Sequence, residues 1–488
     1  MGRVALSKMI LLPRCLYVLQ NSNCLIPRST FAELNTLLVS LVWAGKRNRV
    51  KLEVLKLDLE QGGLGLPDLQ MYYLSGLLQY ATQWCADGPN REKRLLAGVL
   101  ASEELPALLM DGGSTCLNNP FIVQQVALAW KWAVTRVLRR APYAKLLPIA
   151  WLKPFRQIQE VMDLTQWYEG GCTVIGDLYI NERYILRQAA LDTFSLQPGQ
   201  YLQYAKIMHT MRGIWPMFPA EPTESQTLKV ILDPGSRGGR ISRIYSALKQ
   251  DRRLELNGAR DNWARDMPTP LSDNEWKRAC LQVKEVASNV RFKLTQFYVL
   301  HQAYLSPRRL SRIYPHRSAA CARCGANAAS FLHMIWECAT LQAYWETILT
   351  ILRRATVLRL EFSIKVCVLG VLPLPRKGRK MANRFAQLGL VLTKRRIAIH
   401  WTAVVPPSVS RWRTDMGEWA AAEERRLKLV RTDINAERDI QAWAEMLNEV
   451  MLENDNTGEG SGIATDITES GEAPRGNTVR MIEEGTQM

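Results

Sequence analysis

Three cysteines and one histidine in the last third of the chain have the residue types and the spacing of a metal site. Cys321, Cys324, His333 and Cys338 follow the pattern C-x2-C-x8-H-x4-C. Thiolate sulfur and imidazole nitrogen are ligands that zinc prefers, and four of them complete a tetrahedral site with no open position for a substrate. The sequence therefore predicts a structural Zn2+ site within a small zinc knuckle at residues 321–338, and it argues against a catalytic metal.

The alternative is that these residues are ordinary buried thiols and a core histidine. The chain has ten cysteines and five histidines, and three of the cysteines and one histidine fall within 18 residues. Such crowding of scarce residue types favours metal binding. Gly325, directly after the first cysteine pair, suits the tight turn that this pair needs. The other cysteines are scattered, which favours a reducing compartment over a disulfide framework.

The elements that position this site belong to a long chain of ordinary globular composition. Its 488 residues, 47% hydrophobic and 22% charged, are enough for about two to four domains. Lys8, Pro13 and Arg14 interrupt the apolar residues at the amino terminus, so no signal peptide is expected. No apolar run approaches the ~20 residues of a membrane span. The sequence predicts an intracellular protein, cytoplasmic, nuclear or both, without a membrane partner or a small-molecule substrate.

The charge balance of the chain favours a polyanionic partner. Lys and Arg number 63 and Asp and Glu number 46, which gives a net charge of +17. An excess of this size is typical of proteins that bind nucleic acid. The alternative is a solvated basic surface without a dedicated ligand. The segment from Glu453 onward is acidic, so the rest of the chain is more basic than the total indicates.

Apolar residues recur mostly at helical spacing, and the expected fold class is mainly α with several domains. Residues 1–85 form one helical region, and residues 86–218 form a helical middle region. Residues 219–240, rich in Pro, Gly, Ser and Thr, are the expected linker. Residues 241–452 form a carboxyl-terminal domain that contains the knuckle, and residues 453–488 an acidic tail that is expected to be disordered.

Within the carboxyl-terminal domain, two stretches have the helical pattern over an unusual length. Residues 276–305 read as one long helical stretch, with Ser272 or Asp273 as its expected cap. Residues 412–452 read as one long charged helix with an apolar side. Helices are therefore expected on both sides of the knuckle.

Several blocks of sequence occur in a distinctive order. GRVALSKMILLPRCLYVLQ begins at Gly2, IPRSTFAELNTLLVSLVWAGKRNRV at Ile26 and GGLGLPDLQMYYLSGLLQY at Gly62. FKLTQFYVLHQAYLSPRRLSRIYP, from Phe292, precedes the cysteine cluster, and VLGVLPLP, from Val368, follows it. This order resembles the thumb and the carboxyl-terminal zinc-knuckle region of LINE-type (non-LTR) retrotransposon reverse transcriptases. The resemblance implies a fragment with a thumb-like helical unit at residues 1–85 and a Cys3His module flanked by helices.

The chain lacks the residues that perform catalysis in that family. A polymerase needs paired aspartates to hold two metal ions, and the sequence contains no Asp-Asp pair. The family's endonuclease, with its histidine and carboxylate set, has no counterpart either. No active site is therefore expected in this chain, and the resemblance implies that catalysis would require a palm or endonuclease domain in trans.

A thumb grips a template–primer duplex through its phosphates, which requires cations and little base readout. The resemblance therefore makes two sets of cations candidates for binding RNA or an RNA–DNA hybrid. They are Arg3, Lys8, Lys46, Arg47, Arg49 and Lys51 near the amino terminus, and Arg308, Arg309, Arg312, Arg317 and Arg323 beside the knuckle. The alternative for both sets is a solvated helix face.

Tyr304 and Trp336 are aromatic candidates in the same region. They would stack on unpaired bases if their rings were exposed, and they would be core residues otherwise. The predicted function is non-catalytic binding that, by the resemblance, positions template RNA for target-primed reverse transcription. The alternative is a degenerate retroelement remnant that acts as a structural or protein-interaction module.

Overall fold

The structure, a computed structural model, describes residues 1–21, 26–85, 121–132, 149–151, 153–180, 183–214, 226–232, 239–252, 258–372, 379–430 and 434–452. Within these ranges the chain is built almost entirely of helices, so the predicted mainly α class is confirmed. The described β structure is one antiparallel pair, β1 (Tyr179–Ile180) and β2 (Arg183–Tyr184). The predicted acidic tail, residues 453–488, lies outside the described residues.

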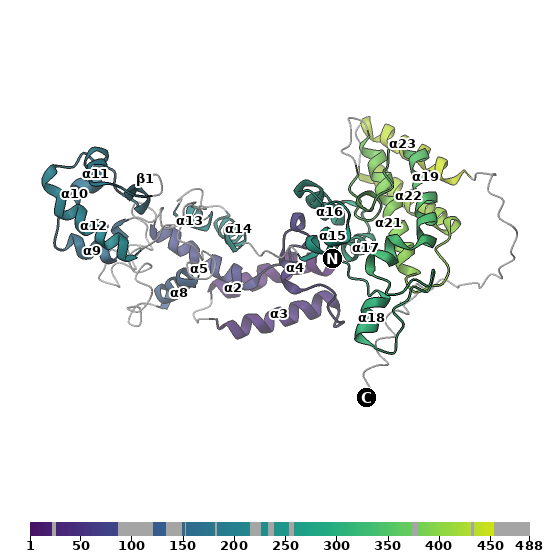
Figure 1. Ribbon diagram of the computed structural model, residues 1–488, viewed down its shortest axis with the longest axis horizontal. Helices are drawn as coiled ribbons and strands as arrows, with labels where there is room; N and C mark the ends of the chain where they lie inside the picture. The colour runs from purple at the N-terminus through teal and green to yellow at the C-terminus, as the bar shows by residue number, and fades with distance from the viewer. Residues whose placement is uncertain are drawn as a thin grey trace.

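The described residues form an elongated molecule with two hydrophobic cores (Figure 1). One, the middle core, includes Leu78, Trp84, Phe155 and Trp167. The other, the carboxyl-terminal core, is centred on fully buried aromatic side chains: Trp263, Phe297, Trp345, Phe385, Trp412 and Trp443. Each fully buried large apolar side chain contributes roughly 1.5–3 kcal/mol relative to an exposed one, so these residues fix where the elements meet.

The amino-terminal elements connect the two cores. They are α1 (Gly2–Leu6), the π-helical turn η1 (Ser7–Leu11), α2 (Leu12–Asn21), α3 (Arg28–Trp43), α4 (Leu52–Lys56), the 3-10 turn η2 (Leu59–Gln61) and α5 (Leu69–Cys85). Val4, Leu55 and Leu66 pack in the carboxyl-terminal core, whereas Phe31 and Leu78 pack in the middle core. Residues 1–85 therefore bury some of their apolar side chains in the middle core and others in the carboxyl-terminal core, and they form no core of their own.

The middle core is formed by short elements around α5. They are α8 (Phe121–Trp132), η6 (Ile149–Trp151), α9 (Lys153–Gln159), α10 (Thr165–Glu169), η7 (Ile175–Leu178), the two strands, α11 (Arg187–Thr193), η8 (Pro198–Gln200), α12 (Tyr201–Ile214), α13 (Gln226–Leu232) and α14 (Arg240–Arg252). Figure 1 places α9 to α12 at the end of the molecule farthest from the carboxyl-terminal helices.

The boundaries of the cores differ from the domain boundaries expected from the sequence. Helix α13 lies inside the predicted linker 219–240, and its Thr227 and Ile231 are buried. Ile244 and Leu248 of α14 belong to the middle core, although the sequence assigned them to the carboxyl-terminal domain. The Pro and Gly residues on both sides of α13 give residues 219–240 the composition of a linker, although the stretch contains this short apolar helix. Linker residues 219–225 and 233–238 lie outside the described part, and Arg240 is the first residue of α14.

The carboxyl-terminal core is formed by longer helices. They are α15 (Gly258–Asp266), α16 (Asp273–Glu285), α17 (Val290–Leu300), α18 (Pro307–Ile313), the π-helical turn η9 (His333–Glu337), α19 (Ala339–Thr356), α20 (Ile364–Cys367), α21 (Lys380–Ile399), α22 (Val409–Val430) and α23 (Ile434–Met451). None of the helices in the described ranges combines the length and the apolar character that a membrane crossing requires.

Both long helical stretches of this domain are divided in the structure. Ser272 caps α16 through a reciprocal pair of hydrogen bonds with Glu275, which confirms the expected start of the first stretch. The stretch then breaks before α17, where the Asn289 side chain accepts the Arg291 N–H at 2.7 Å and starts a new helix. The second stretch consists of α22 and α23, which pack against each other (Figure 1).

The Gly62–Pro67 segment is a compact turn whose glycines have a steric reason. A Cβ on Gly63 would lie 1.9 Å from the carbonyl oxygen of Leu57. Gly62 adopts a φ of +88°, where glycine is favoured. The Gly62 carbonyl lies 2.7 Å from the Nε2 atom of His301. This turn therefore joins the amino-terminal elements to α17 of the carboxyl-terminal core.

Lys394, in the middle of α21, is fully buried in the carboxyl-terminal core. Its Nζ donates to Gln296 Oε1 at 2.5 Å and to the Val368 carbonyl at 3.1 Å. A neutral amine has two N–H groups for these two acceptors, whereas an ammonium has a third that also needs a partner. Burial lowers the pKa of Lys394 from 10.5 to about 7.

We expect this lysine to make the stability of the chain depend on pH above neutrality. Between pH 7 and about 10 the unfolded chain binds more protons than the folded chain, so the free energy of unfolding rises with pH, by at most ~1.4 kcal/mol per unit. Urea unfolding of the native chain and of Lys394→Met at pH 7, 8 and 9 measures this slope. The variant should have the shallower slope, and equal slopes would contradict the assignment.

Candidate metal centre

The first cysteine pair lies in a tight turn after α18. The Cys321 N–H donates to the Ala326 carbonyl at 2.9 Å, and the Gly325 N–H donates to the Cys321 carbonyl at 2.8 Å. Gly325 has a φ of +72°, which a side chain would disfavour. This turn leaves Cys321 buried and Cys324 exposed, and both thiols face the segment that carries the other two candidate ligands.

His333 and Cys338 are brought together by the π-helical turn η9. In an α-helix two residues five apart project about 140° away from each other. Here the Cys338 N–H donates to the His333 carbonyl at 3.1 Å, the i to i+5 bond of a π-helix, so the wider turn brings Cys338 back to the side of His333. The Ser330 hydroxyl accepts the His333 N–H at 2.9 Å and fixes the start of the turn.

The four side chains converge on one point. The ligand atoms of Cys321, Cys324, His333 and Cys338 all lie within 4.8 Å of one another, and Cys324 Sγ is 3.3 Å from His333 Nε2. Ligand atoms around a tetrahedral zinc ion lie about 3.5–3.8 Å apart. The cluster therefore needs a contraction of at most about 1 Å to coordinate an ion, and the four residues can hold a metal.

The surroundings of Cys338 favour its thiolate form, which is the form that binds metals. Burial alone would raise the pKa of this thiol, but the N–H of Leu341 and hydrogen bonds from Cys324 and Thr340 lower it below its usual value. Cys338 occupies the N-cap position of the 18-residue helix α19, where unpaired N–H groups and the helix dipole stabilise negative charge.

Arg323, predicted to contact nucleic acid, instead fastens the knuckle to the rest of the domain. Its guanidinium donates to the main-chain carbonyls of Met334 at 3.1 Å, His400 at 3.2 Å and Trp401 at 3.3 Å. These bonds connect the cysteine turn to η9 and to the end of α21. The role predicted for Arg323 is therefore corrected to a structural one.

The two aromatic candidates are also occupied by packing. Trp336 is 7% exposed, and its ring lies against Trp345 and Phe362, with ring centres 6.0 Å and 4.8 Å away. Tyr304 is packed between Tyr298 and Trp401, and burial raises its pKa to about 12. Trp336 is therefore a core residue, as the alternative had it, and Tyr304 is half-buried and packed against the same core, so neighbouring rings occupy the faces predicted to stack on bases.

Helix α18 presents the exposed cations beside the knuckle. Arg308, Arg309 and Arg312, here called the α18 arginines, are exposed, and Arg317 is half-buried. The Ser306 side chain caps the helix, and the Arg308 N–H donates to the Ala329 carbonyl at 3.1 Å. Main-chain bonds thus hold α18 against the knuckle and leave the guanidinium groups exposed. In Figure 1 this helix projects from the body of the carboxyl-terminal domain.

The amino-terminal cations divide into two kinds. Arg3 donates to the Leu41 carbonyl at 2.9 Å and Lys8 to the Leu64 carbonyl at 3.0 Å, so both fasten neighbouring elements. Lys46, Arg47, Arg49 and Lys51 are exposed in the segment that follows α3. The Arg49 guanidinium lies 5.2 Å from the ring centre of Tyr298 in α17. The contact between Arg49 and Tyr298 places this exposed segment beside the carboxyl-terminal domain.

Two further arginines, which the sequence prediction missed, lie at this junction. The Arg395 guanidinium is 5.6 Å from the ring centre of Phe292. Burial lowers its pKa, and the positive charge of nearby Arg291 acts in the same direction. The charges of Arg49 and Arg395 both act on Tyr304. We call Arg49, Arg291 and Arg395 the junction arginines.

The sequence signal for Arg395 was the basic run Lys394-Arg395-Arg396, but a basic run of this kind also suits the carboxyl end of a helix.

No model of a known protein family matches the chain.

Proposed function

We propose that this chain binds RNA or an RNA–DNA hybrid through a zinc-stabilised module, as the non-catalytic carboxyl-terminal part of a LINE-type reverse transcriptase. In this proposal residues 1–85 act as a thumb-like unit, and the chain helps to position template RNA inside the cell, in the cytoplasm, the nucleus or both. The proposal depends most on one observation: three thiols and an imidazole converge within 4.8 Å beside the exposed α18 arginines.

Zinc is the ion that suits this ligand set. Thiolates and imidazole favour Zn2+ over the hard cations, and four ligands leave no position for a catalytic water. The ion would tie the cysteine turn to η9 and the start of α19, because two ligands come from each side, and the bond from the Arg308 N–H to the Ala329 carbonyl would hold α18 beside them. The cations on this frame would then contact phosphates, and the affinity would depend on salt through counterion release.

Fluorescence anisotropy with a labelled single-stranded RNA and an RNA–DNA hybrid tests this function. We expect binding that weakens steeply between 50 and 200 mM salt, with a slope of about −0.7 in log K against log salt for each single-strand phosphate contact. Binding should also weaken after the metal is removed with a chelator. An affinity that depends on neither salt nor metal would contradict the proposal.

A second candidate function, docking of a protein partner, is favoured by one surface. Leu6, Met9, Tyr17 and Leu37 are between 51% and 76% exposed on α1, η1, α2 and α3. Large apolar side chains exposed on successive elements are typical of an interaction site. Arg3, Lys8 and Arg14 lie on α1, η1 and α2, and residues 1–21 contain no acidic side chain. The surface therefore suits a partner with an apolar, acidic face, and we propose a reverse transcriptase palm domain in trans.

Isothermal titration calorimetry with a separately expressed palm domain tests this docking. The native chain should bind, and Met9→Asp combined with Tyr17→Asp should not. Both side chains are exposed, so the double variant should keep the unfolding temperature of the native chain. Absence of binding by the native chain, or equal binding by both proteins, would contradict the docking proposal and leave RNA binding unaffected.

A further inference from the structure

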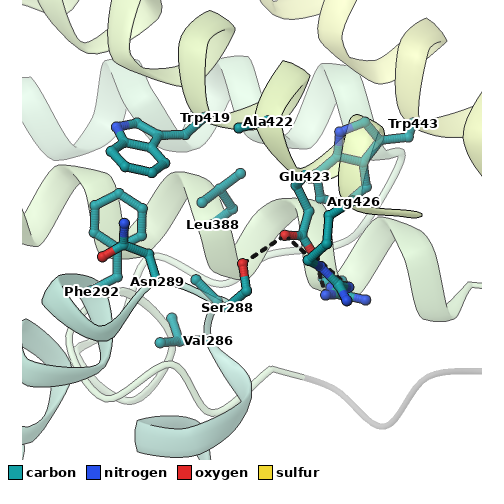
Figure 2. Close-up of a pocket in the computed structure, with 12 residues that line it drawn as sticks. Val286, Ser288, Asn289, Phe292, Leu388, Trp419, Ala422, Glu423, Arg426 and Trp443 are labelled. Carbon is teal, nitrogen blue, oxygen red and sulfur yellow. Dashed lines mark hydrogen bonds and ion pairs between the residues drawn. The ribbon is translucent and has the colours of Figure 1, made fainter. Parts of the chain in front are cut away.

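A cavity lies between the α16–α17 connection and the helices α21, α22 and α23. Its volume is about 220 Å3, less than the ~300–1,000 Å3 of pockets that take drug-sized ligands. Figure 2 shows Phe292 and Trp419 on one side of it and Glu423 with Ser288 and Arg426 on the other, with Leu388 between them. The cavity thus has an apolar wall and a polar wall, and its size suits one flat ring.

The polar wall is fixed in place by a buried carboxylate. Glu423 is 8% exposed and accepts from the Ser288 hydroxyl at 2.9 Å and from Arg426 Nη2 at 2.8 Å, and it forms an ion pair with Arg384. Burial opposes ionisation of Glu423, but these partners lower its pKa below the usual value. Arg426 donates to Glu423 through Nε and Nη2, and a guanidinium has five N–H groups, so this side chain has more donors than the carboxylate accepts.

The apolar wall presents aromatic rings in a defined arrangement. Phe292 and Trp419 pack edge to face, with ring centres 4.7 Å apart and planes at 74°. Phe292 is buried, whereas Trp419 is half-buried, so the indole retains surface that a ligand can cover. A flat ring in the cavity would contact aromatic surface on one side and N–H donors on the other.

Two of the junction arginines, Arg291 and Arg395, lie beside the cavity wall. The Arg395 guanidinium lies over the same Phe292 ring that forms the apolar wall, and Arg291 is the adjacent residue in α17. A strand whose phosphates lie along these cations would have a base within reach of the opening. Single-stranded binders combine cations along the backbone with aromatic surface for a base in this way.

We propose that this cavity binds one unpaired nucleobase of single-stranded RNA or DNA, with a carbonyl-bearing edge, as in uracil or guanine, directed at Arg426. This inference rests on the proposed nucleic-acid binding and adds a preference for single strands. A duplex, whose bases are stacked and paired, would contact the cations alone.

The Ala422→Leu variant tests the cavity directly. Ala422 lines the cavity from α22, so leucine would fill it without removing a packed side chain. Loss of one stacked base weakens binding by roughly 5- to 100-fold, and we expect this loss for a labelled 12-nucleotide oligo(U). Binding of a blunt-ended RNA duplex, in which every base is paired, should be unchanged. Ala421→Leu, half-buried on the same helix and away from the cavity, is the matched control.

Trp419→Leu is a second variant that keeps an apolar side chain, and it should show the same selective loss. If both variants bind oligo(U) as tightly as the native chain while the duplex also binds, the base site is wrong and the proposed function stands. If the native chain binds neither RNA, both proposals are wrong. An equal loss for oligo(U) and the duplex would also overturn the base site.

Discussion

The Cys338→Ser variant is expected to lose its metal and to unfold the knuckle. Structural zinc contributes about 10–16 kcal/mol of apparent binding free energy in small zinc modules, and that energy stabilises the fold. Cys338 is also fully buried and starts α19, so an empty site would free both the cysteine turn and the start of this helix. Thermal unfolding followed by circular dichroism should show a new transition at lower temperature.

Cys280→Ser is the matched control for this variant. Cys280 is equally buried, lies in the same core and is not part of the cluster. Replacing a buried thiol by a hydroxyl costs about 1–3 kcal/mol where the hydroxyl has no partner. The control should therefore melt slightly earlier than the native chain and retain its metal. Equal effects of both variants, with no change on addition of a chelator, would mean that the four residues are an ordinary part of the core.

Reversing the three α18 arginines is expected to produce the largest loss of RNA affinity. Arg308→Glu combined with Arg309→Glu and Arg312→Glu replaces three attractive phosphate contacts with three repulsive ones, and we expect at least about a 100-fold loss at low salt. The slope of log K against log salt for single-stranded RNA should fall in magnitude by about 2, or about 0.7 for each lost contact. The fold should survive, because α18 is held by its main-chain bonds to Ser306 and Ala329.

The control for this variant reverses three exposed cations at the other end of the molecule. Arg183→Glu, Lys206→Glu and Arg212→Glu change the net charge by the same amount, on β2 and α12. If the two triple variants lose the same affinity, binding follows the total charge of the chain and has no site at the knuckle. A loss confined to the α18 variant supports the proposed interface.

The metal cluster could be predicted from the sequence because its ligands are close in the chain. The spacing of four residues over 18 positions is a local signal, and the turn at Gly325 adds to it. The helical periodicity likewise predicted the mainly α class, and the Ser272 cap was identified from its residue type. These features depend on neighbours within a few residues, and local patterns report them well.

The features that were missed depend on contacts between distant parts of the chain. Arg323 bonds to carbonyls 77 and 78 residues away, which no spacing pattern indicates. Arg49 lies over the ring of Tyr298 in α17, far from it in the chain. The sequence left open whether the Trp336 ring is exposed or buried, and the ring that covers it belongs to Phe362, beyond α19. The division of residues 1–85 between two cores has the same origin, since Leu55 and Leu66 pack with residues beyond 260.

Metal content is the most direct test of the central claim, that three thiols and one imidazole hold a single zinc ion. Elemental analysis of the purified chain by mass spectrometry, together with titration of accessible thiols, measures it. We expect one zinc per chain, with three thiols that become reactive only after chelation, and no zinc in Cys338→Ser. A folded native chain without bound zinc, with Cys324 reactive from the start and unaffected by added zinc, would contradict it.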